Sequence, residues 1–341
     1  MSNEADESLE SSGVEIYKWQ VAGHLYEAHK SQKSNNDNPF NFSVLRDKTS
    51  GRILKPVQAF PYGEREIAFY ESVFLGQQQQ QQPMASRRSA DAAATTSSGE
   101  EEEEEKGEGR GGERQQHHDV SQWSDVVARF FGVRAVSFLG TMRPYLELED
   151  LCGAFAQPCV MDVKIGFRPC DPYVSEEKLR RSQTKYPLLG ETGFRILGIK
   201  FTDRLSRQAV VKDRVWGKSL LTKEAVVQAF QLYYSNHSAA YVKRVVHAFG
   251  TRIAALLRWL ERQPTFHVYS SSLLLIFEGD EQAATADGRQ AAPRTLVKMI
   301  DFTHAYPAQE PDDDYLRGAK SLLRFLDQSQ RSYAPQQLLP P

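Results

Sequence analysis

The chain has 341 residues, 40% hydrophobic and 25% charged, a composition typical of one large or two modest globular domains. No run of 18 apolar residues occurs, and the acidic, serine-rich start is unlike a signal or transit peptide, so we expect neither a transmembrane helix nor a targeting leader. Cys152, Cys159 and Cys170 form no CxxC pair, which predicts free thiols in the cytoplasm or the nucleus.

The formal net charge of −2 conceals an uneven distribution. Residues 1–15 hold five acids and no base, and residues 76–118 hold nine acids and five bases. The rest of the chain carries 37 basic and 30 acidic residues, a net charge of +7. A mildly basic folded part suits a polyanionic ligand. We expect no stable nucleic-acid binding, because the basic residues lack interleaved aromatic residues and no recognition fold is evident.

Composition divides the chain into five regions. Residues 1–15 form an acidic tail, and residues 76–118 form a low-complexity insertion with six consecutive glutamines (77–82) and six consecutive glutamates (100–105). Neither can bury enough apolar surface to offset the entropy of ordering, so both are predicted to be disordered. The insertion interrupts a predicted N-lobe, residues 16–148. A C-lobe, residues 149–330, and a tail, residues 331–341, complete the chain.

Hydrophobic periodicity predicts the following elements in chain order. The first part holds strands at 17–23 and 52–57, helices at 65–73 and 123–131, and strands at 133–139, 144–148 and 159–165. The second part holds helices at 175–185, 222–234, 239–261 and 314–326, and strands at 193–201, 272–277 and 295–302. Strands dominate the first part and long helices the second. This order predicts an α+β protein of two lobes with a cleft between them.

The strand at 159–165 is the most informative segment. Met161, Val163 and Ile165 share one face, and Asp162 and Lys164 share the other. A carboxylate beside an ammonium can orient a hydroxyl and hold a phosphate. The alternative is a structural ion pair at a sheet edge.

Two further segments carry candidate site residues. Lys55 ends an apolar strand, and a helix carrying Glu66 follows it, an arrangement that holds a lysine on nucleotide phosphates in protein kinases. Asp301 ends another apolar strand and is a candidate Mg²⁺ ligand, with His304 close to the same ligand. The alternative for Asp301 is a cap on the following turn. The absence of GxGxxG, Walker A and HRD…N sequences argues against an ordinary protein kinase.

These residues belong to motifs of a known family. The pattern PxxxDxKxG stands at Pro158, Asp162, Lys164 and Gly166, followed by Ser-Ser-Leu-Leu at 271–274 and Ile-Asp-Phe at 300–302. In this order and spacing, the chain resembles the inositol polyphosphate kinases over about residues 16–75 and 120–330. Segments 20–24, 185–187 and 193–198 most resemble the family's multikinase branch.

The resemblance implies a two-lobed, protein-kinase-like (ATP-grasp-like) fold that uses ATP and Mg²⁺. Lys55 would contact the ATP phosphates, and Glu149 and Leu151 would contact adenine through their backbone. Ser272, in the second motif, would also belong to the ATP site, and Asp301 would hold Mg²⁺. Asp162 would bind the ATP ribose or the acceptor hydroxyl, and it could also accept the hydroxyl proton.

For the acceptor, the resemblance implies a helical segment at about 167–192 that supplies Arg181, Ser182 and Lys185. Lys164 and His304 would complete this site. The basic residues after the signature are expected to hold substrate phosphates, the alternative being a solvated helix face. Tyr62 departs from the family pattern, because multikinases place an arginine seven residues after the ATP lysine.

The implied activity is transfer of the γ-phosphate of ATP to hydroxyls of inositol tris- and tetrakisphosphates by a monomer. An inositol hexakisphosphate kinase and an inositol trisphosphate 3-kinase are the alternatives within the family, and a phosphoinositide lipid is a further candidate acceptor. A noncatalytic scaffold in nuclear or signalling complexes is the alternative from another class, suggested by the glutamine and glutamate runs.

Overall fold

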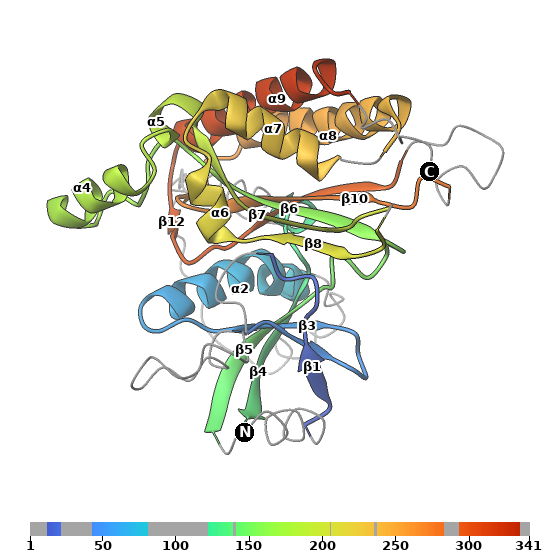
Figure 1. Cartoon of the computed structure of the whole chain (residues 1–341). Coiled ribbons are helices and arrows are strands. Elements are labelled where there is room, and N and C mark those ends of the chain that lie inside the picture. Colours follow the sequence, from blue (N-terminus) through green and yellow to red (C-terminus); the bar gives the residue numbers. More distant parts are fainter. Residues whose placement is uncertain are drawn as a thin grey trace, which may run out of the picture.

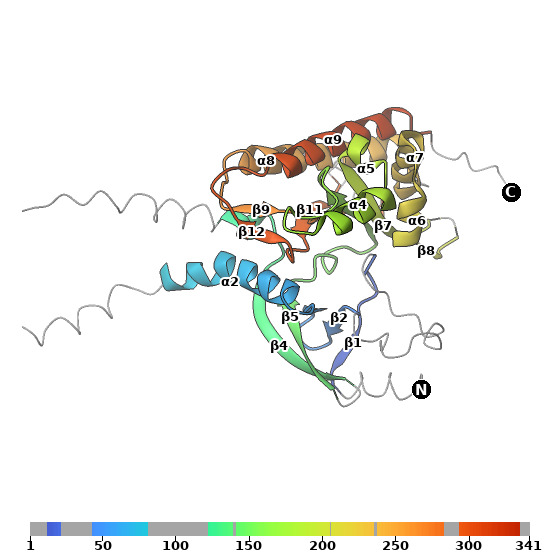
Figure 2. The ribbon, with the colours of Figure 1, turned by 90° about the vertical axis from the view of Figure 1, so that its left-hand side faces the viewer.

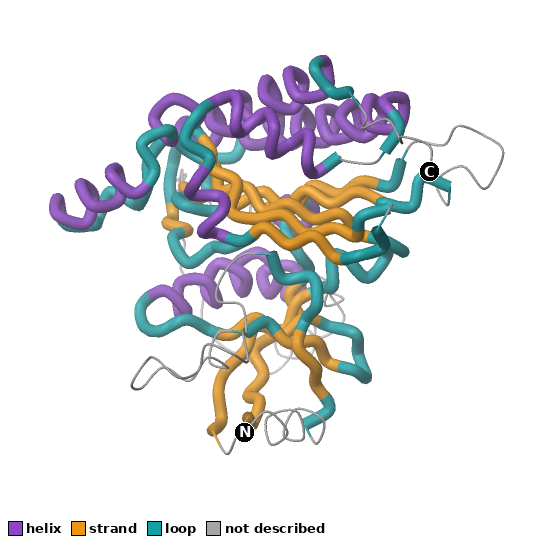
Figure 3. Tube along the Cα trace, in the orientation of Figure 1, coloured by secondary structure: helices purple, strands orange, loops and turns teal. Residues whose placement is uncertain are grey.

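A computed structural model of the chain describes residues 12–21, 43–80, 122–138, 141–204, 206–234, 237–282 and 293–334. Two five-stranded antiparallel sheets organise these residues (Figure 1). Helices and sheets alternate in layers, as the tube in Figure 3 shows. The α+β, two-lobed prediction is therefore confirmed. Most of the predicted acidic tail and insertion lies outside the described residues.

The N-terminal sheet has the order β1-β2-β3-β5-β4. Its strands are β1 (Val14–Ile16), β2 (Leu45–Asp47), β3 (Ile53–Pro56), β5 (Thr141–Leu148) and β4 (Phe130–Phe138). Alternating side chains divide between its two faces: Leu54 and Tyr145 belong to a small outer cluster, whereas Ile53 and Leu146 join the main core with helix α2 (Tyr62–Gln80). This helix lies between the two sheets (Figures 1 and 2) and extends five residues into the segment predicted to be an insertion.

The C-terminal sheet has the order β11-β10-β6-β7-β8. Its strands are β11 (Thr295–Ile300), β10 (Ser272–Glu278), β6 (Pro158–Ile165), β7 (Phe194–Thr202) and β8 (Ala209–Lys212). One face is covered by α7 (Lys223–Tyr233), α8 (Ala239–Leu260) and α9 (Asp313–Arg331) (Figure 1). The shorter elements are η3 (Gln122–Asp125), α4 (Glu176–Lys185), α5 (Leu189–Thr192), α6 (Arg214–Ser219), β9 (Phe266–Val268) and β12 (Ala305–Pro307).

Local sequence explains where the covering helices begin. The side chains of Thr222, Ser238 and Asp312 accept backbone N–H groups in the first turns of α7, α8 and α9, respectively. Apolar residues of α8 then recur every three or four positions, from Tyr241 to Leu260, and all of them are buried against the sheet and its neighbouring helices. The predicted helices at 222–234, 239–261 and 314–326 are therefore confirmed.

Two predicted elements are wrong. The strand expected at 17–23 lies earlier, at 14–16, because Val14 is the residue that packs into the outer cluster; residues 17–21 form a turn, and 22–23 lie outside the described residues. The helix expected at 123–131 is one 3-10 turn followed by extended chain. There Val127 bridges to Met299 and Phe130 begins β4, since β-branched and aromatic residues favour pairing with strands.

An aromatic cluster joins α2 to the C-lobe. The rings of Phe69 and Phe302 stack with centroids 4.0 Å apart, and Trp123 meets Phe69 edge-on at 5.2 Å and Trp259 edge-on at 4.8 Å. Trp123 is fully buried, and its Nε1–H donates to Thr265 Oγ1 over 3.0 Å. Ring packing therefore fixes α2 relative to α8.

Within the ranges given above, no helix combines the length and the hydropathy needed to cross a bilayer.

Replacing Trp123 with alanine is expected to lower the free energy of unfolding by about 3–5 kcal/mol, because it leaves a large cavity where the lobes meet. Leu221, with 59% of its surface exposed, is the control, and Leu221→Ala should change stability by less than about 0.5 kcal/mol. Urea denaturation followed by circular dichroism measures both. Equal stability of the two variants would contradict the assigned role of Trp123.

Candidate active site

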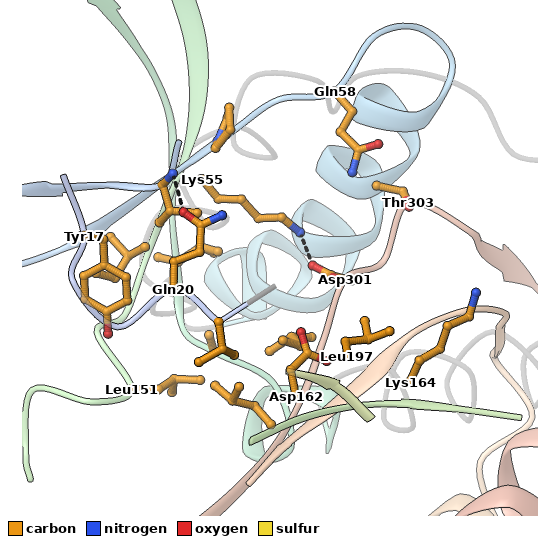
Figure 4. Close-up of a pocket in the computed structure, with 18 of the residues that line it drawn as sticks. Tyr17, Gln20, Lys55, Gln58, Leu151, Asp162, Lys164, Leu197, Asp301 and Thr303 are labelled. Carbon is orange, nitrogen blue, oxygen red and sulfur yellow. Dashed lines mark hydrogen bonds and ion pairs between the residues drawn. The ribbon is translucent and has the colours of Figure 1, made fainter. Parts of the chain in front are cut away.

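A cavity of about 600 Å³ is lined by residues of both sheets. The N-terminal sheet and α2 contribute Lys55, Tyr62 and Leu148, and the C-terminal sheet contributes Asp162 and Lys164. Figure 4 shows Lys55, Asp162, Lys164 and Asp301 around this space, on ribbons that are far apart in the sequence. The structure thus brings Lys55 and the candidate residues of the first and third family motifs to one place.

Lys55 connects both lobes through two carboxylates. Its Nζ donates to Glu66 Oε1 on α2 and to Asp301 Oδ1 beyond β11, each over 2.6 Å. Burial alone would lower the pKa of Lys55, but Asp301 and Glu66 outweigh it and raise the pKa above the usual lysine range. Glu66 is fully buried and also accepts the Phe302 N–H over 2.9 Å. Lys55 is therefore a fixed cation at the wall of the cavity.

Asp301 sits on a strained backbone. Its φ is +65°, in the left-handed region that few residues other than glycine and asparagine adopt. The Ser271 hydroxyl holds it there by donating to the Asp301 carbonyl over 2.7 Å. The carboxylate consequently turns off the end of β11 toward Lys55, and its side chain keeps 41% exposure to the cavity.

Strand register explains why Asp162 and Lys164 lie near Asp301. β6 pairs with β10, where Ser272 stands opposite Lys164, and Ser272 also stands opposite Ile300 of β11. Asp301 therefore follows β11 at the same position along the sheet as Lys164, whose side chain belongs to the charged face of β6. The signature glycine, Gly166, has φ +111°, and a Cβ there would lie 2.6 Å from Asp314 Oδ2. Only glycine fits this turn after the strand.

Asp162 is a buried carboxylate with an unused acceptor. Only 3% of its surface is exposed, and its Oδ1 has no hydrogen-bond partner among the described residues. Burial raises the pKa of Asp162 to about 7, and the nearby Asp301 carboxylate acts in the same direction. An unpaired buried oxygen beside a cavity is suited to accept a hydrogen bond from a bound hydroxyl.

Lys164 donates one hydrogen bond to the Pro169 carbonyl over 3.1 Å. Burial, together with the guanidinium groups of Arg195 and Arg214, lowers its pKa to about 8. Unlike Lys55, it has no carboxylate within ion-pair distance among the described residues.

A connecting segment after β5 forms another wall of the cavity. Glu149 and Leu151 both line it, as the sequence predicted for the hinge. The Glu149 N–H donates to the Arg129 carbonyl over 2.9 Å, and no backbone N–H of the described residues donates to the Glu149 carbonyl. Tyr17 clamps the intervening residue by donating to Asp150 Oδ1 over 2.6 Å. The turn at 17–21 thus closes the cavity from the N-terminal side.

The rings of His304 and Tyr62 lie together at the end of the cavity that is away from the segment after β5. Their rings lie 5.0 Å apart, and His304 Nδ1 lies 2.6 Å from Asp171 Oδ2. Burial lowers the pKa of His304, although Asp171 opposes this shift. Lys178 of α4 donates to the Tyr62 hydroxyl over 3.3 Å. At the position where the family's multikinases carry an arginine, this chain therefore has a phenol that contacts the first turn of α4.

Four predicted site residues do not line the cavity. Ser272 is fully buried on β10, directly opposite Lys164 and therefore on the same side of the sheet as the charged face of β6. Arg181, Ser182 and Lys185 lie on α4, whose residues include none that is buried and which projects beside the C-lobe (Figure 1). Arg181 instead pairs along the helix with Glu177 at 3.5 Å.

Two lining residues that the sequence analysis missed are Arg195 and Arg214. Arg195 lies on β7 directly opposite Lys164, and Arg214 begins α6. A signal for Arg195 was present: a single arginine near the start of the otherwise apolar run 194–199 resembles the charged positions of β6. Arg214 carries no such signal, because it lies in a polar stretch.

The residues present fit a nucleotide-bound divalent metal better than a metal held by protein alone. No group of three or more His, Cys, Asp or Glu side chains that could hold a metal occurs in the described part of the chain. Glu149, Asp162 and Asp301 are the acidic residues that line the cavity, and Mg²⁺ typically takes one or two carboxylates together with substrate phosphates and water.

Comparisons with known proteins agree with this geometry. The sequence matches the inositol polyphosphate kinase family over residues 145–327. It is 30% identical over 288 residues to an inositol polyphosphate multikinase of Mus musculus, covering 82% of this chain and 58% of that protein. It is 29% identical over 213 residues to an inositol hexakisphosphate kinase 3 of Homo sapiens, covering 54% of this chain and 51% of that protein. The chain thus spans little more than half the length of these relatives.

A solved structure has the same fold. The inositol phosphate multikinase of S. cerevisiae, in complex with ADP and Mn²⁺, superposes with a TM-score of 0.56 at 22% identity, covering 81% of this chain and 98% of that one. Since the family match includes more than half of the residues and the mouse relative aligns with most of the chain, the chain belongs to the inositol polyphosphate kinase family.

Proposed function

We propose that the chain is an ATP-dependent inositol polyphosphate multikinase, transferring the γ-phosphate of ATP to hydroxyls of inositol tris- and tetrakisphosphates. One observation carries the proposal: Lys55, Asp162, Lys164 and Asp301 line a single cavity in a chain of this family. Transfer between two highly charged substrates requires fixed cations and groups that orient the reacting atoms, and the cavity offers lysines for the first task and aspartates for the second.

The nucleotide would occupy the side of the cavity nearest α2 and the hinge. Lys55, pre-positioned by Glu66, would bind ATP phosphates. The Glu149 carbonyl and the Leu151 amide would face adenine, and Ser272 would belong to the ATP site beside the charged face of β6. Asp301 would hold Mg²⁺, whose charge offsets that of the phosphates during transfer. The yeast multikinase of the same fold was solved in complex with ADP and Mn²⁺, which supports the use of a nucleotide and a divalent metal.

The acceptor would occupy the side formed by β6, β7 and α4. Lys164 and His304 line it, and Arg181, Ser182 and Lys185 would reach substrate phosphates from α4. Asp162, with its unused oxygen and its raised pKa, is suited to orient the attacking hydroxyl and to accept its proton. Ribose binding by Asp162 is the alternative role.

Other family activities have less support. The human inositol hexakisphosphate kinase aligns with 54% of the chain, whereas the mouse multikinase aligns with 82%. Neither a 3-kinase nor a noncatalytic scaffold is favoured by a particular observation, and the Lys55 ion pairs are those that a working kinase needs.

We also propose that the protein acts as a monomer in the nucleus or the cytoplasm, without a nucleic-acid partner. The three cysteines support a reducing compartment, because all of them are free and buried. A phosphoinositide lipid is a further candidate acceptor.

Purified protein with radiolabelled ATP, Mg²⁺ and inositol trisphosphate is expected to yield products with additional phosphates, separable by anion-exchange chromatography. Lys55→Met and Asp301→Asn should each reduce kcat by about 100-fold or more, since each removes charge that faces the transferred phosphate. Asparagine tolerates the positive φ of residue 301, so that variant should fold.

Lys218→Met is the control, because Lys218 is exposed on α6 and does not line the cavity. No transfer by the wild type above background, or wild-type turnover by Asp301→Asn, would refute the proposed function. Transfer to inositol hexakisphosphate alone would replace it with the pyrophosphate-forming alternative.

Asp162→Asn is expected to abolish transfer but to stabilise the ligand-free protein at neutral pH. Between about pH 4 and pH 7 the unfolded chain ionises this carboxyl while the folded protein keeps it protonated, so the wild type loses stability as the pH rises. The stability gain of Asp162→Asn should therefore be roughly 2 kcal/mol larger at pH 8 than at pH 5.

Urea denaturation of nucleotide-free protein in EDTA at both pH values measures this gain. Asp313→Asn is the matched control, because that side chain is 80% exposed, and it should show no pH-dependent gain. A gain that is equal at pH 5 and pH 8 would contradict a raised pKa at Asp162.

Replacing both Arg181 and Lys185 with alanine tests the contribution of α4. If these side chains reach the acceptor, its KM should rise about 10-fold or more while the KM for ATP stays unchanged. Lys243→Ala is the control, because Lys243 is exposed on α8, which covers the opposite face of the C-terminal sheet. Unchanged acceptor KM in the double variant would remove α4 from the acceptor site.

A further inference from the structure

Three cations share one end of the cavity. Lys164 lies on β6, Arg195 stands directly opposite it on β7, and Arg214 is the first residue of α6. The helix comes close to β7 because residue 217 is a glycine, where a Cβ would lie 2.2 Å from the Ile196 carbonyl oxygen. Strand pairing and this close approach therefore fix the three side chains in one region.

These cations lack counter-charges. Among the described residues, no carboxylate lies within ion-pair distance of any of the three. The Arg195 guanidinium rests 5.6 Å from the centre of the Tyr186 ring, and its buried Nε has no acceptor. Lys164 has only the Pro169 carbonyl. The three side chains therefore present several hydrogen-bond donors that have no acceptor among the described residues.

This arrangement opposes the stability of the empty protein. Like charges directly opposite each other on neighbouring strands repel. The effect is visible in the pKa of Lys164, which is lowered first by burial and then by Arg195 and Arg214. Lys55, in contrast, is neutralised by two carboxylates at the other end of the same cavity. Clustered cations that the fold leaves unpaired are best explained by an anionic ligand.

Sheet order indicates which substrate the cluster serves. β7 flanks β6 on one side, whereas β10 and β11, which lead to Asp301 and Lys55, flank it on the other. Arg195 is thus separated by the width of β6 from the wall assigned to the nucleotide. A phosphate beside Arg195 belongs to the acceptor, and each such phosphate carries roughly −1.5 to −2 charges near neutral pH.

We propose that Arg195 binds a phosphate of the inositol polyphosphate acceptor, together with Lys164 and Arg214, and thereby selects for acceptors phosphorylated at that position. This inference rests on the proposed function. The planar guanidinium can donate two parallel hydrogen bonds to phosphate oxygens, and the Tyr186 ring supports it from outside the cavity.

Arg195→Met, Arg195→Lys and the control Lys218→Met test the proposal with the full chain. Steady-state kinetics with inositol trisphosphate should show an acceptor KM raised about 10- to 100-fold in Arg195→Met, with the KM for ATP unchanged. Arg195→Lys should recover part of the affinity because it keeps the charge but loses the bidentate geometry. Lys218→Met should behave like the wild type.

A second measurement does not depend on catalysis. Thermal unfolding without ATP, at constant ionic strength, is followed with inositol hexakisphosphate as the polyanion probe. The probe should stabilise the wild type and Lys218→Met clearly more than Arg195→Met. If the wild type transfers no phosphate, the proposed function fails, yet a lost stabilisation in Arg195→Met would still support the anion site.

Three results would overturn the inference. Equal stabilisation of the wild type and Arg195→Met by the probe would remove Arg195 from the site. A rise in the KM for ATP as large as that for the acceptor would assign Arg195 to the nucleotide. Loss of folding in both Arg195 variants would make its role structural.

Discussion

The ion pairs of Lys55 with Glu66 and Asp301 are the constraint on which the arrangement of the two lobes depends. Glu66 is 11 residues away and Asp301 is 246 residues away, so one ammonium group joins β3, α2 and the end of β11. Glu66 is fully buried, and leaving it without a cation would cost several kcal/mol. The stacked rings of Phe69 and Phe302 lie beside this group and hold α2 at the required distance. Charge and packing therefore fix the same geometry.

The second requirement, a reactive face on a buried strand, is met by the central position of β6. Because β6 has neighbours on both sides, its apolar residues Met161, Val163 and Ile165 can bury completely while Asp162 and Lys164 face the cavity. The helical layer covers only the apolar face (Figure 3). An edge strand would expose these charges to solvent and would lose the shift in the pKa of Asp162, whose main cause is burial.

Sequence reasoning succeeded where a pattern was local. The charged alternation of β6, the helix pattern of α8 and the Lys55–Glu66 spacing all act over a few residues, so each element was predicted at its place. It failed where tertiary pairing decided: Val127 joins β11 as an isolated bridge, which turns an apolar helix-like run into extended chain. Arg195 and Arg214 were missed for the same reason, since only the register of β7 and the approach of α6 bring them to Lys164.

The cavity is electrically asymmetric, and this asymmetry follows from the order of the strands. On the β11 side, the fold supplies its own counter-charges and is stable without a ligand. On the β7 side, no carboxylate among the described residues lies within ion-pair distance of the facing cations, so in the proposed function an acceptor phosphate would supply the missing charge and its binding would stabilise the folded state. In the proposed function this division would favour catalysis: the lysine that would meet the nucleotide is already in place, while the acceptor would be attracted by cations that the protein alone does not neutralise.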